Sequence, residues 1–409
     1  MRIFPIIAII LLAVSSSVWA LEDGRIGVLY VGCITRSPPF WTMRTDPLFS
    51  ISFVQATTRD WGAWGPIQQV DESGEATRRM VRLYMPRTYK QYSENYDVLV
   101  IANANRHAVG GNNIEMLARG VREAGIGFVM GGGWETFGGN ADRPPWGDSA
   151  IGELLPTEDV LQAYIEWGSL IIDEEEHEFI RSLPWHEKPE FMMVYWHNQV
   201  TLKPGAQLLA HVESSFGFGT NDPGMVTWEI PGGSRVFAIT AEIHRACMAE
   251  EIGEYWEYCL DLGSNLVIYL DKRPVPQDLA LVHAVREKIF EIYTRRGIVV
   301  GLISFLDAFG ANTMQIETDL DEVDQAIKLA TPLYLQLQWE ESLEAFRKVG
   351  EMMREIESGA MRFKDRALLW VYFIEWLAVT GTALIAGVIL WSIMVRRRLY
   401  REVKRTKFR

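Results

Sequence analysis

The segment from Tyr96 to Gly139 constrains the fold of this chain more than any other part. It begins with an apolar run over 97–102, continues with a helical stretch over 112–124, and returns with a second apolar run over 126–130. Short β-branched runs are typical of strands buried on both faces of a parallel sheet, and a helix is the usual crossover between them. With Asn113 as the predicted N-cap, the sequence indicates a strand–helix–strand unit of an α/β fold.

Glycines and two large side chains follow the second strand of this unit. Because ligands of open parallel sheets bind at the carboxyl ends of the strands, we expect a binding site in the loop over 131–139. Glycines allow a ligand to approach the backbone closely, and an aromatic ring and a carboxylate can contact it. The predicted ligand-binding residues are Gly131, Gly132, Gly133, Trp134 and Glu135.

Further strands and helices are predicted on both sides of this unit. Before it, the sequence predicts a helix over 75–84 and strands over 25–32 and 51–55. After it, a turn at Pro231-Gly232-Gly233 separates the last two of four strand-like runs, which cover 191–196, 207–212, 225–230 and 235–240. We therefore predict one α/β domain over residues 21–272.

Two apolar segments predict how the chain relates to a membrane. Residues 1–20 have the pattern of a secretory signal peptide, with an uncleaved N-terminal anchor as the alternative. Residues 367–395 carry a single charge, Glu375, and about 20 residues of helix are enough to cross a hydrocarbon core. The tail over 396–409 holds eight Lys or Arg and one Glu, which is typical of the cytoplasmic side. The sequence predicts a single-pass type I protein of the cell membrane, with its ectodomain outside.

Charge and cysteine content narrow the predicted function. The formal net charge is −13 although the tail is basic, so the ectodomain is strongly acidic. This disfavours nucleic acid as a partner, because binding it requires Lys and Arg to neutralise phosphates. Of the three cysteines, Cys247 and Cys259 can form a disulfide in an exported domain or remain thiols. The chain has no CxxC or zinc-ligand spacing, and we predict no metal and no cofactor.

Residues 273–366 are predicted to form a helical membrane-proximal region. A helix is expected over 279–295, and an apolar run over 298–309 follows it. Apolar residues then recur at helical spacing over 321–337 and 340–357, which indicates a helical hairpin or stalk. This apolar stripe either packs within its own chain or pairs residues 321–357 with a second copy.

The order of several motifs resembles the glutamine amidotransferase-like domain family, a relative of the class I glutamine amidotransferases. The motifs are Tyr96-Asp97-Val98, the glycine-rich return over 131–139, the Ile151–Pro156 stretch that ends in Leu-Leu-Pro, and the segments 177–185, 203–206, 226–229 and 232–238. The resemblance covers about residues 24–270. It implies a Rossmann-like parallel sheet with helices on both faces.

The chain departs from the enzymes of this group at the nucleophile. Class I amidotransferases carry a cysteine on the tight turn after this strand, where helix N-terminal amides lower its pKa. This chain has only glycines there, so we expect no glutamine hydrolysis by the covalent route. The resemblance places a base after the last strand, where Glu242 and His244 lie, and Cys33 is a candidate replacement for the nucleophile.

We therefore predict a non-catalytic binding or scaffolding protein of the cell surface, with a small molecule, a glycan or a protein as its ligand. Loop tryptophans stack on sugars but also cover cores, and this chain has them at Trp41, Trp61, Trp64, Trp134 and Trp146. One alternative is a hydrolase or transferase that uses Glu242 and His244. A metal-dependent hydrolase would use His197, His244 and Glu242 or Glu135 as ligands. A third alternative is a structural envelope component that associates through its helical region.

Overall fold

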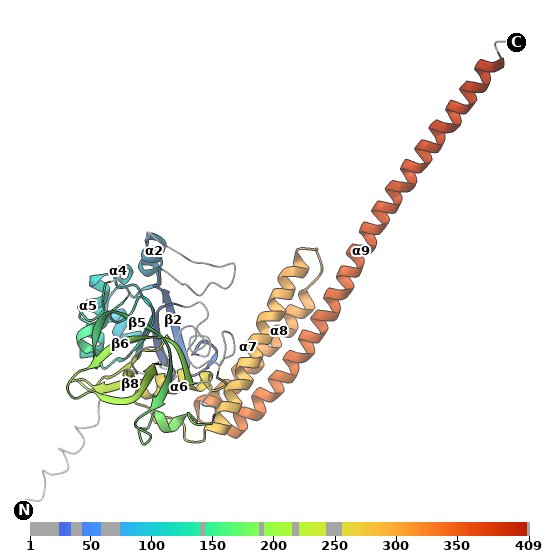
Figure 1. Ribbon diagram of the computed structural model, residues 1–409. Coiled ribbons are helices and arrows are strands. Elements are labelled where there is room, and N and C mark those ends of the chain that lie inside the picture. The colour runs from blue at the N-terminus through green and yellow to red at the C-terminus, as the bar shows by residue number, and fades with distance from the viewer. Residues whose placement is uncertain are drawn as a thin grey trace, which may run out of the picture. The chain divides into compact units, whose positions relative to one another are not determined.

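The computed structural model describes residues 24–33, 43–58, 74–139, 144–187, 192–214, 221–242 and 256–406 (Figure 1). The predicted signal segment lies outside the described residues, as do Trp41, Trp61, Trp64, His244 and Cys247. The chain divides into two compact units. The first comprises Met1–Phe290 and Ala330–Ala345, and the second comprises Glu291–Leu329 and Phe346–Arg409.

The described part of the first unit forms a nine-stranded mixed sheet in the order β2-β1-β3-β4-β9-β8-β7-β5-β6. Its strands are β1 (Ile26–Gly32), β2 (Phe49–Gln55), β3 (Val98–Ala102), β4 (Gly127–Gly131), β5 (Thr157–Ile172), β6 (Met193–Leu202), β7 (Gln207–Ser214), β8 (Asn221–Glu229) and β9 (Arg235–Ile239).

Five neighbouring strands, β2-β1-β3-β4-β9, are parallel. The predicted strand–helix–strand unit is confirmed, because β3 and β4 pair in parallel, with Val98 opposite Gly127, and α5 (Gly111–Glu123) connects them. The predicted N-cap is wrong: α5 begins after Gly110, and the Asn113 side chain donates to the carbonyl of Val109 (2.7 Å). Gly125, with a φ of 79°, ends this segment in the left-handed conformation that glycine adopts without strain.

The other half of the sheet corrects the expectation of a purely parallel sheet. Strands β8, β7, β5 and β6 pair antiparallel, and β8 joins the parallel half through an antiparallel pairing with β9. The connection between β8 and β9 is the predicted turn at 231–233, which is too short for a crossover and therefore forces the antiparallel arrangement. The sequence missed β5, whose polar residues at Glu158, Asp159 and Gln162 interrupt the apolar pattern of a strand.

Helices cover both faces of the parallel half. On one face, Leu99, Ile101, Phe128 and Met130 belong to a core that also includes side chains of α2 (Glu75–Tyr84), α3 (Tyr89–Asn95) and α5. On the other face, α6 (Cys259–Leu270) is nearly completely buried, and its Tyr269 ring packs edge-on against Phe237 of β9. The alternation of side chains along a strand explains how one short strand supplies both cores.

The second unit is built from parts of three helices, α7 (Leu279–Asp307), α8 (Met314–Leu335) and α9 (Trp339–Thr406). The predicted helical hairpin is confirmed by α8 and α9, which are separated by a short turn. The predicted apolar stripe is buried within the chain, including Val323, Ile327, Val349 and Met353. Among the described helices, α9 is the one long and apolar enough to cross a membrane by length and composition.

Candidate functional site

The glycine-rich loop at the carboxyl end of β4 is closed by the chain itself. The Gly132 amide donates to the carbonyls of Ile239 (2.7 Å), the last residue of β9, and of Ala241 (3.0 Å), which follows this strand. A Cβ at position 132 would lie 1.9 Å from the Thr240 carbonyl oxygen, and a Cβ at position 133 would lie 2.6 Å from Cβ of Asn103. Close packing against neighbouring backbone and side chain therefore explains why glycine occupies these two positions.

Glu135 lies in a buried network that joins the ends of three parallel strands. Its side chain is 1% exposed, and its carboxylate accepts hydrogen bonds from the Thr58 amide (2.7 Å), the Thr58 hydroxyl and Nδ2 of Asn105 (2.8 Å). Thr58 follows β2, Asn105 follows β3 and Glu135 follows β4. The Glu135 carboxylate was predicted to contact a ligand, but it accepts hydrogen bonds from three donors of its own domain.

Two asparagines hold the same loop, and sequence reasoning missed both. Oδ1 of Asn103 accepts from the Glu135 amide (2.9 Å), and Asn103 itself has a φ of 47°, a left-handed conformation that asparagine tolerates. Asn198 of β6 accepts from the Gly133 amide (2.9 Å) and donates back to the Gly133 carbonyl (3.2 Å). The position of Asn103 directly after β3 could have indicated its role, because polar residues that follow parallel strands meet at the carboxyl edge of the sheet.

Of the three predicted catalytic candidates, the structure describes Cys33 and Glu242, and these two lie apart. Cys33 is fully buried at the end of β1, and Glu242 follows β9, which is three strands away and therefore roughly 14 Å across the sheet. Glu242 is 5% exposed, and its amide donates to the carbonyl of Trp196 (3.0 Å). His244 lies outside the described residues.

His197, a predicted metal ligand, is fully buried and pairs with a carboxylate on β8. Its Nε2 lies 3.0 Å from Oδ2 of Asp222, which also accepts from Nε2 of Gln199 (3.2 Å). Nδ1 of His197 has no hydrogen-bond partner among the described residues. Those residues also contain no group of three or more His, Cys, Asp or Glu placed to hold a metal ion.

Of the five loop tryptophans considered as ligand contacts, the structure describes Trp134 and Trp146, and these two have different environments. Trp146 is fully buried, and its indole nitrogen donates to the carbonyls of Ala104 and Glu135, both at 2.9 Å. This side chain therefore covers the core beneath the loop, which was one of the two predicted roles. Trp134 is half-buried and is the more accessible of the two.

One carboxyl group near this loop has a strongly shifted pKa. Burial raises the pKa of Asp159 on β5 to about 6, against the lowering effects of a hydrogen bond from the Gly147 amide (2.6 Å) and of the positive charge of Lys203. A raised carboxyl pKa means that the folded state binds the proton more tightly than the unfolded state. Asp159 therefore opposes stability progressively as the pH rises from about 4 to about 6.

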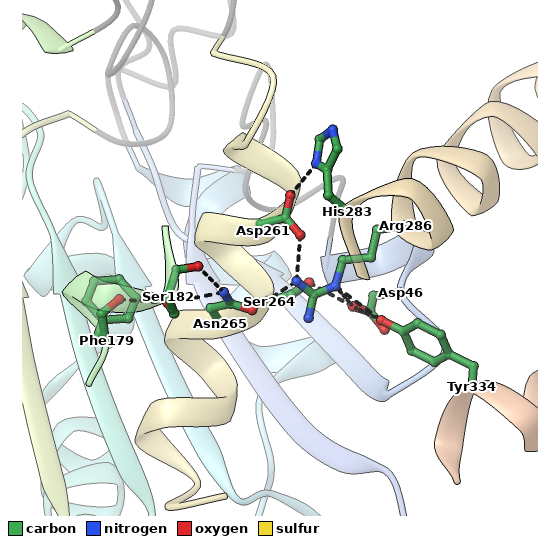
Figure 2. A network of polar contacts seen from close by, with 9 residues as sticks. All are labelled: Asp46, Phe179, Ser182, Asp261, Ser264, Asn265, His283, Arg286 and Tyr334. Carbon is green, nitrogen blue, oxygen red and sulfur yellow. Dashed lines mark hydrogen bonds and ion pairs between the residues drawn. The ribbon is translucent and has the colours of Figure 1, made fainter. Parts of the chain in front are cut away.

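A second polar centre lies in the first unit, around the buried side chain of Arg286 on α7 (Figure 2). Its guanidinium lies between two carboxylates, with Nη1 2.7 Å from Oδ1 of Asp261 and Nε 3.3 Å from Oδ2 of Asp46. Nη1 also donates to Oδ1 of Asn265 (2.9 Å). The Tyr334 hydroxyl of α8 donates to Oδ2 of Asp46 (2.9 Å). This Arg286 cluster joins α6, α7, the end of α8 and the segment before β2.

His283 completes the Arg286 cluster. Its Nδ1 lies 2.6 Å from Oδ2 of Asp261, and this hydrogen bond raises the pKa of His283, while partial burial opposes the rise. When His283 is protonated, two cations face the carboxylates of Asp46 and Asp261. The Arg286 side chain is only 4% exposed. A buried cluster of paired charges such as this one fits a structural role, in which it holds the helices against the sheet.

Cys259 is a buried free thiol, and burial raises its pKa to about 12. A thiol with this pKa is inert as a nucleophile at neutral pH. Cys247, with which the sequence allowed a disulfide, lies outside the described residues.

Comparison with known proteins finds likenesses of structure. No family model matches the chain, and no curated protein is similar to it. Cytoplasmic protein STM1381 from Salmonella typhimurium LT2 is similar over 60% of this chain and 99% of its own, with 14% identity and a TM-score of 0.45. Cytoplasmic protein STM3548 from Salmonella typhimurium is similar over 59% of this chain and 98% of its own, with 14% identity and a TM-score of 0.44.

Proposed function

We propose that this chain is a membrane-anchored, non-catalytic binding or scaffolding protein, whose ectodomain is a Rossmann-like relative of the class I glutamine amidotransferases. The ligand would be a small molecule, a glycan or a neighbouring protein that binds near the carboxyl edge of the parallel strands. Trp134 is the residue of the glycine-rich loop that remains partly exposed to contact it.

The closed turn after β4 is the observation that carries this proposal. A class I amidotransferase needs a cysteine side chain at this turn. Here the backbone of Thr240 and Ala241 occupies the space in which a Cβ at position 132 would lie, and Asn103 does the same at position 133. Neither position accepts a nucleophile without movement of the neighbouring chain.

The absence of amidotransferase chemistry can be tested with the purified full-length protein in detergent. We expect no ammonia release from glutamine and no hydrolysis of an activated ester above a heat-inactivated blank, because the turn carries no nucleophile. A Glu242→Gln variant is the matched control. Turnover by the unsubstituted protein that disappears in this variant would contradict the proposal and support the hydrolase alternative that uses Glu242 and His244.

The apolar part of α9 supports the proposed anchor. Over 367–395 its only charge is Glu375, and Arg396, Arg397 and Arg398 follow directly. The flank of a span with the excess of Lys and Arg is retained on the cytoplasmic side, and residues 396–409 carry eight of them against four over 353–366. We therefore propose one span, with the acidic α/β domain outside the cell membrane and the basic tail inside.

The proposed orientation predicts the behaviour of a reporter fused after Arg409. In a bacterial host, we expect a C-terminal green fluorescent protein to fluoresce and a C-terminal alkaline phosphatase to be inactive, because each reporter is active on one side of the membrane only. Replacing Arg396, Arg397 and Arg398 by glutamate should weaken this preference. An active phosphatase fusion of the unsubstituted protein would contradict the orientation.

A further inference from the structure

The end of α7 and its turn into α8 form an apolar surface in the second unit. We call residues 297–314 the apolar tip; Asp307 is its single charged residue. Asp307 accepts a hydrogen bond from the Thr313 hydroxyl (2.9 Å) within the turn. Five large apolar side chains of the tip are well exposed: Ile298 (44%), Val300 (41%), Phe305 (39%), Phe309 (47%) and Met314 (70%).

These exposed side chains are not the ones through which α7 packs within the second unit. Val299 and Leu306, seven residues apart on α7, are fully buried and supply the inward face of the helix. The rings of Phe305 and Phe309 instead contact each other in a tilted arrangement with centroids 4.8 Å apart, while both side chains remain exposed. An exposed apolar surface of this kind marks a site of interaction with a protein or a membrane.

Two ion pairs join α7 to its neighbouring helices, one to α8 and one to α9. Arg296 of α7 lies 2.8 Å from Asp324 of α8, and Arg295 of α7 pairs with Glu357 of α9. Short turns make α7 and α8, and then α8 and α9, antiparallel, so α7 and α9 run in the same direction (Figure 1).

The register places the tip beside the start of the predicted span. Phe305 lies ten residues beyond Arg295, and Ala367 lies ten residues beyond Glu357. At 1.5 Å per residue, both are about 15 Å from the ion pair that joins the two helices. Phe309 lies one turn further, level with the first residues of the apolar segment.

The charges of α9 at this level are those of a membrane surface. Arg362, Lys364 and Arg366 precede the apolar segment together with one carboxylate, Asp365, which pairs with Lys364 (3.5 Å). Lys and Arg that flank a span reach toward lipid headgroups. Trp370 and Tyr372 begin the segment and are typical of the interface. The acidic residues of α8 start only at Glu317, beyond the tip.

We propose that the apolar tip inserts into the outer interface of the same bilayer that α9 crosses. This inference rests on the proposed membrane anchor and adds a second contact with lipid. Phe305 and Phe309 would enter the boundary between headgroups and acyl chains, the depth that interfacial apolar side chains occupy. The tip and the span together would hold the second unit at a fixed height and tilt, which a single helix does not do.

Site-directed fluorescence in liposomes tests this proposal. An environment-sensitive label is attached to full-length protein carrying Phe309→Cys, Leu329→Cys or Leu384→Cys. Leu329 is a matched control because it is 79% exposed on α8 but lies 15 residues from Met314, roughly 22 Å along the helix from the tip. Leu384 reports on the span itself. Cys33 and Cys259 are buried, and the unsubstituted protein labelled in parallel gives the background.

We expect nitroxide attached to the lipids to quench the labels at 309 and 384, and a water-soluble quencher to act on the label at 329. Quenching by lipid at 384 but not at 309 would overturn the insertion while leaving the anchor intact. A label at 309 that is shielded from both quenchers would indicate a protein partner, such as a second copy, and would also overturn it. Absence of lipid quenching at 384 would overturn the anchor, and the inference with it.

Discussion

Replacing Arg286 by methionine is expected to destabilise the first unit by about 3 to 5 kcal/mol, because the change removes the guanidinium that lies between two buried carboxylates. Asp261 is completely buried and Asp46 is 5% exposed, so water cannot replace the lost guanidinium. Methionine preserves much of the apolar stem of arginine, which limits the loss of packing. Denaturant unfolding of the detergent-solubilised full-length protein, followed by near-ultraviolet circular dichroism, would measure the change.

Arg296→Met provides the matched control for this measurement. Arg296 also pairs with an aspartate, Asp324 at 2.8 Å, but both side chains are about one-third exposed. Exposed pairs of this kind contribute about 0 to 1 kcal/mol. Equal, small losses in both variants would contradict a structural role for the Arg286 cluster.

The effect of Arg286→Met should also grow with pH. The pKa of His283 is raised by its hydrogen bond to Asp261, so the stabilisation from its proton is complete below about pH 6.5 and is lost as the pH rises through the folded-state pKa. Glu257 and Glu287 also raise this pKa, and the Tyr258 ring lies 4.6 Å from the imidazole. Without Arg286, His283 is the remaining cation beside Asp261, and its deprotonation should therefore cost the variant more than the unsubstituted protein.

The sequence predicted the parallel half of the sheet because local signals determine it. The apolar runs that became β1, β3 and β4 are short, those of β1 and β3 are rich in β-branched residues, and Gly125 marks the end of the helix between β3 and β4. The helix over 75–84 was predicted with the bounds of α2. The antiparallel half was harder to predict, since the polar residues of β5 hide its strand pattern and strand order depends on pairings distant in sequence.

The Arg286 cluster could not be predicted from the sequence by the same reasoning. Its hydrogen bond between Tyr334 and Asp46 joins residues 288 positions apart, and Asp46 lies in a loop with no periodic pattern. Arg286 itself lies in a helix where an arginine is ordinarily a solvated side chain. Only the three-dimensional arrangement of α6, α7 and α8 shows that it is enclosed.

The sequence predicted a binding site in the glycine-rich loop, but in the structure the residues of this loop contact other parts of the chain. The glycine-rich loop does lie at the carboxyl end of β4. Gly132 and Gly133, however, pack against Thr240 and Asn103, and sequence alone does not distinguish glycines that admit a ligand from glycines that admit neighbouring protein atoms. Sequence alone likewise does not show whether the Glu135 carboxylate contacts a ligand or neighbouring protein atoms. Mutation of Glu135 can distinguish the two.

Glu135→Ala is expected to destabilise the first unit by about 3 to 5 kcal/mol, because it leaves the Thr58 amide, the Thr58 hydroxyl and Nδ2 of Asn105 without their buried acceptor. Glu135→Gln retains one acceptor oxygen and should cost about 1 to 2 kcal/mol. Glu153→Ala removes an exposed carboxylate that pairs with Arg122 and should change stability by less than about 1 kcal/mol. Denaturant unfolding of the three full-length variants would give this order. If Glu135→Ala were as stable as Glu153→Ala, the carboxylate would not hold the strand ends together, and a role in contacting a ligand would become the better explanation for it.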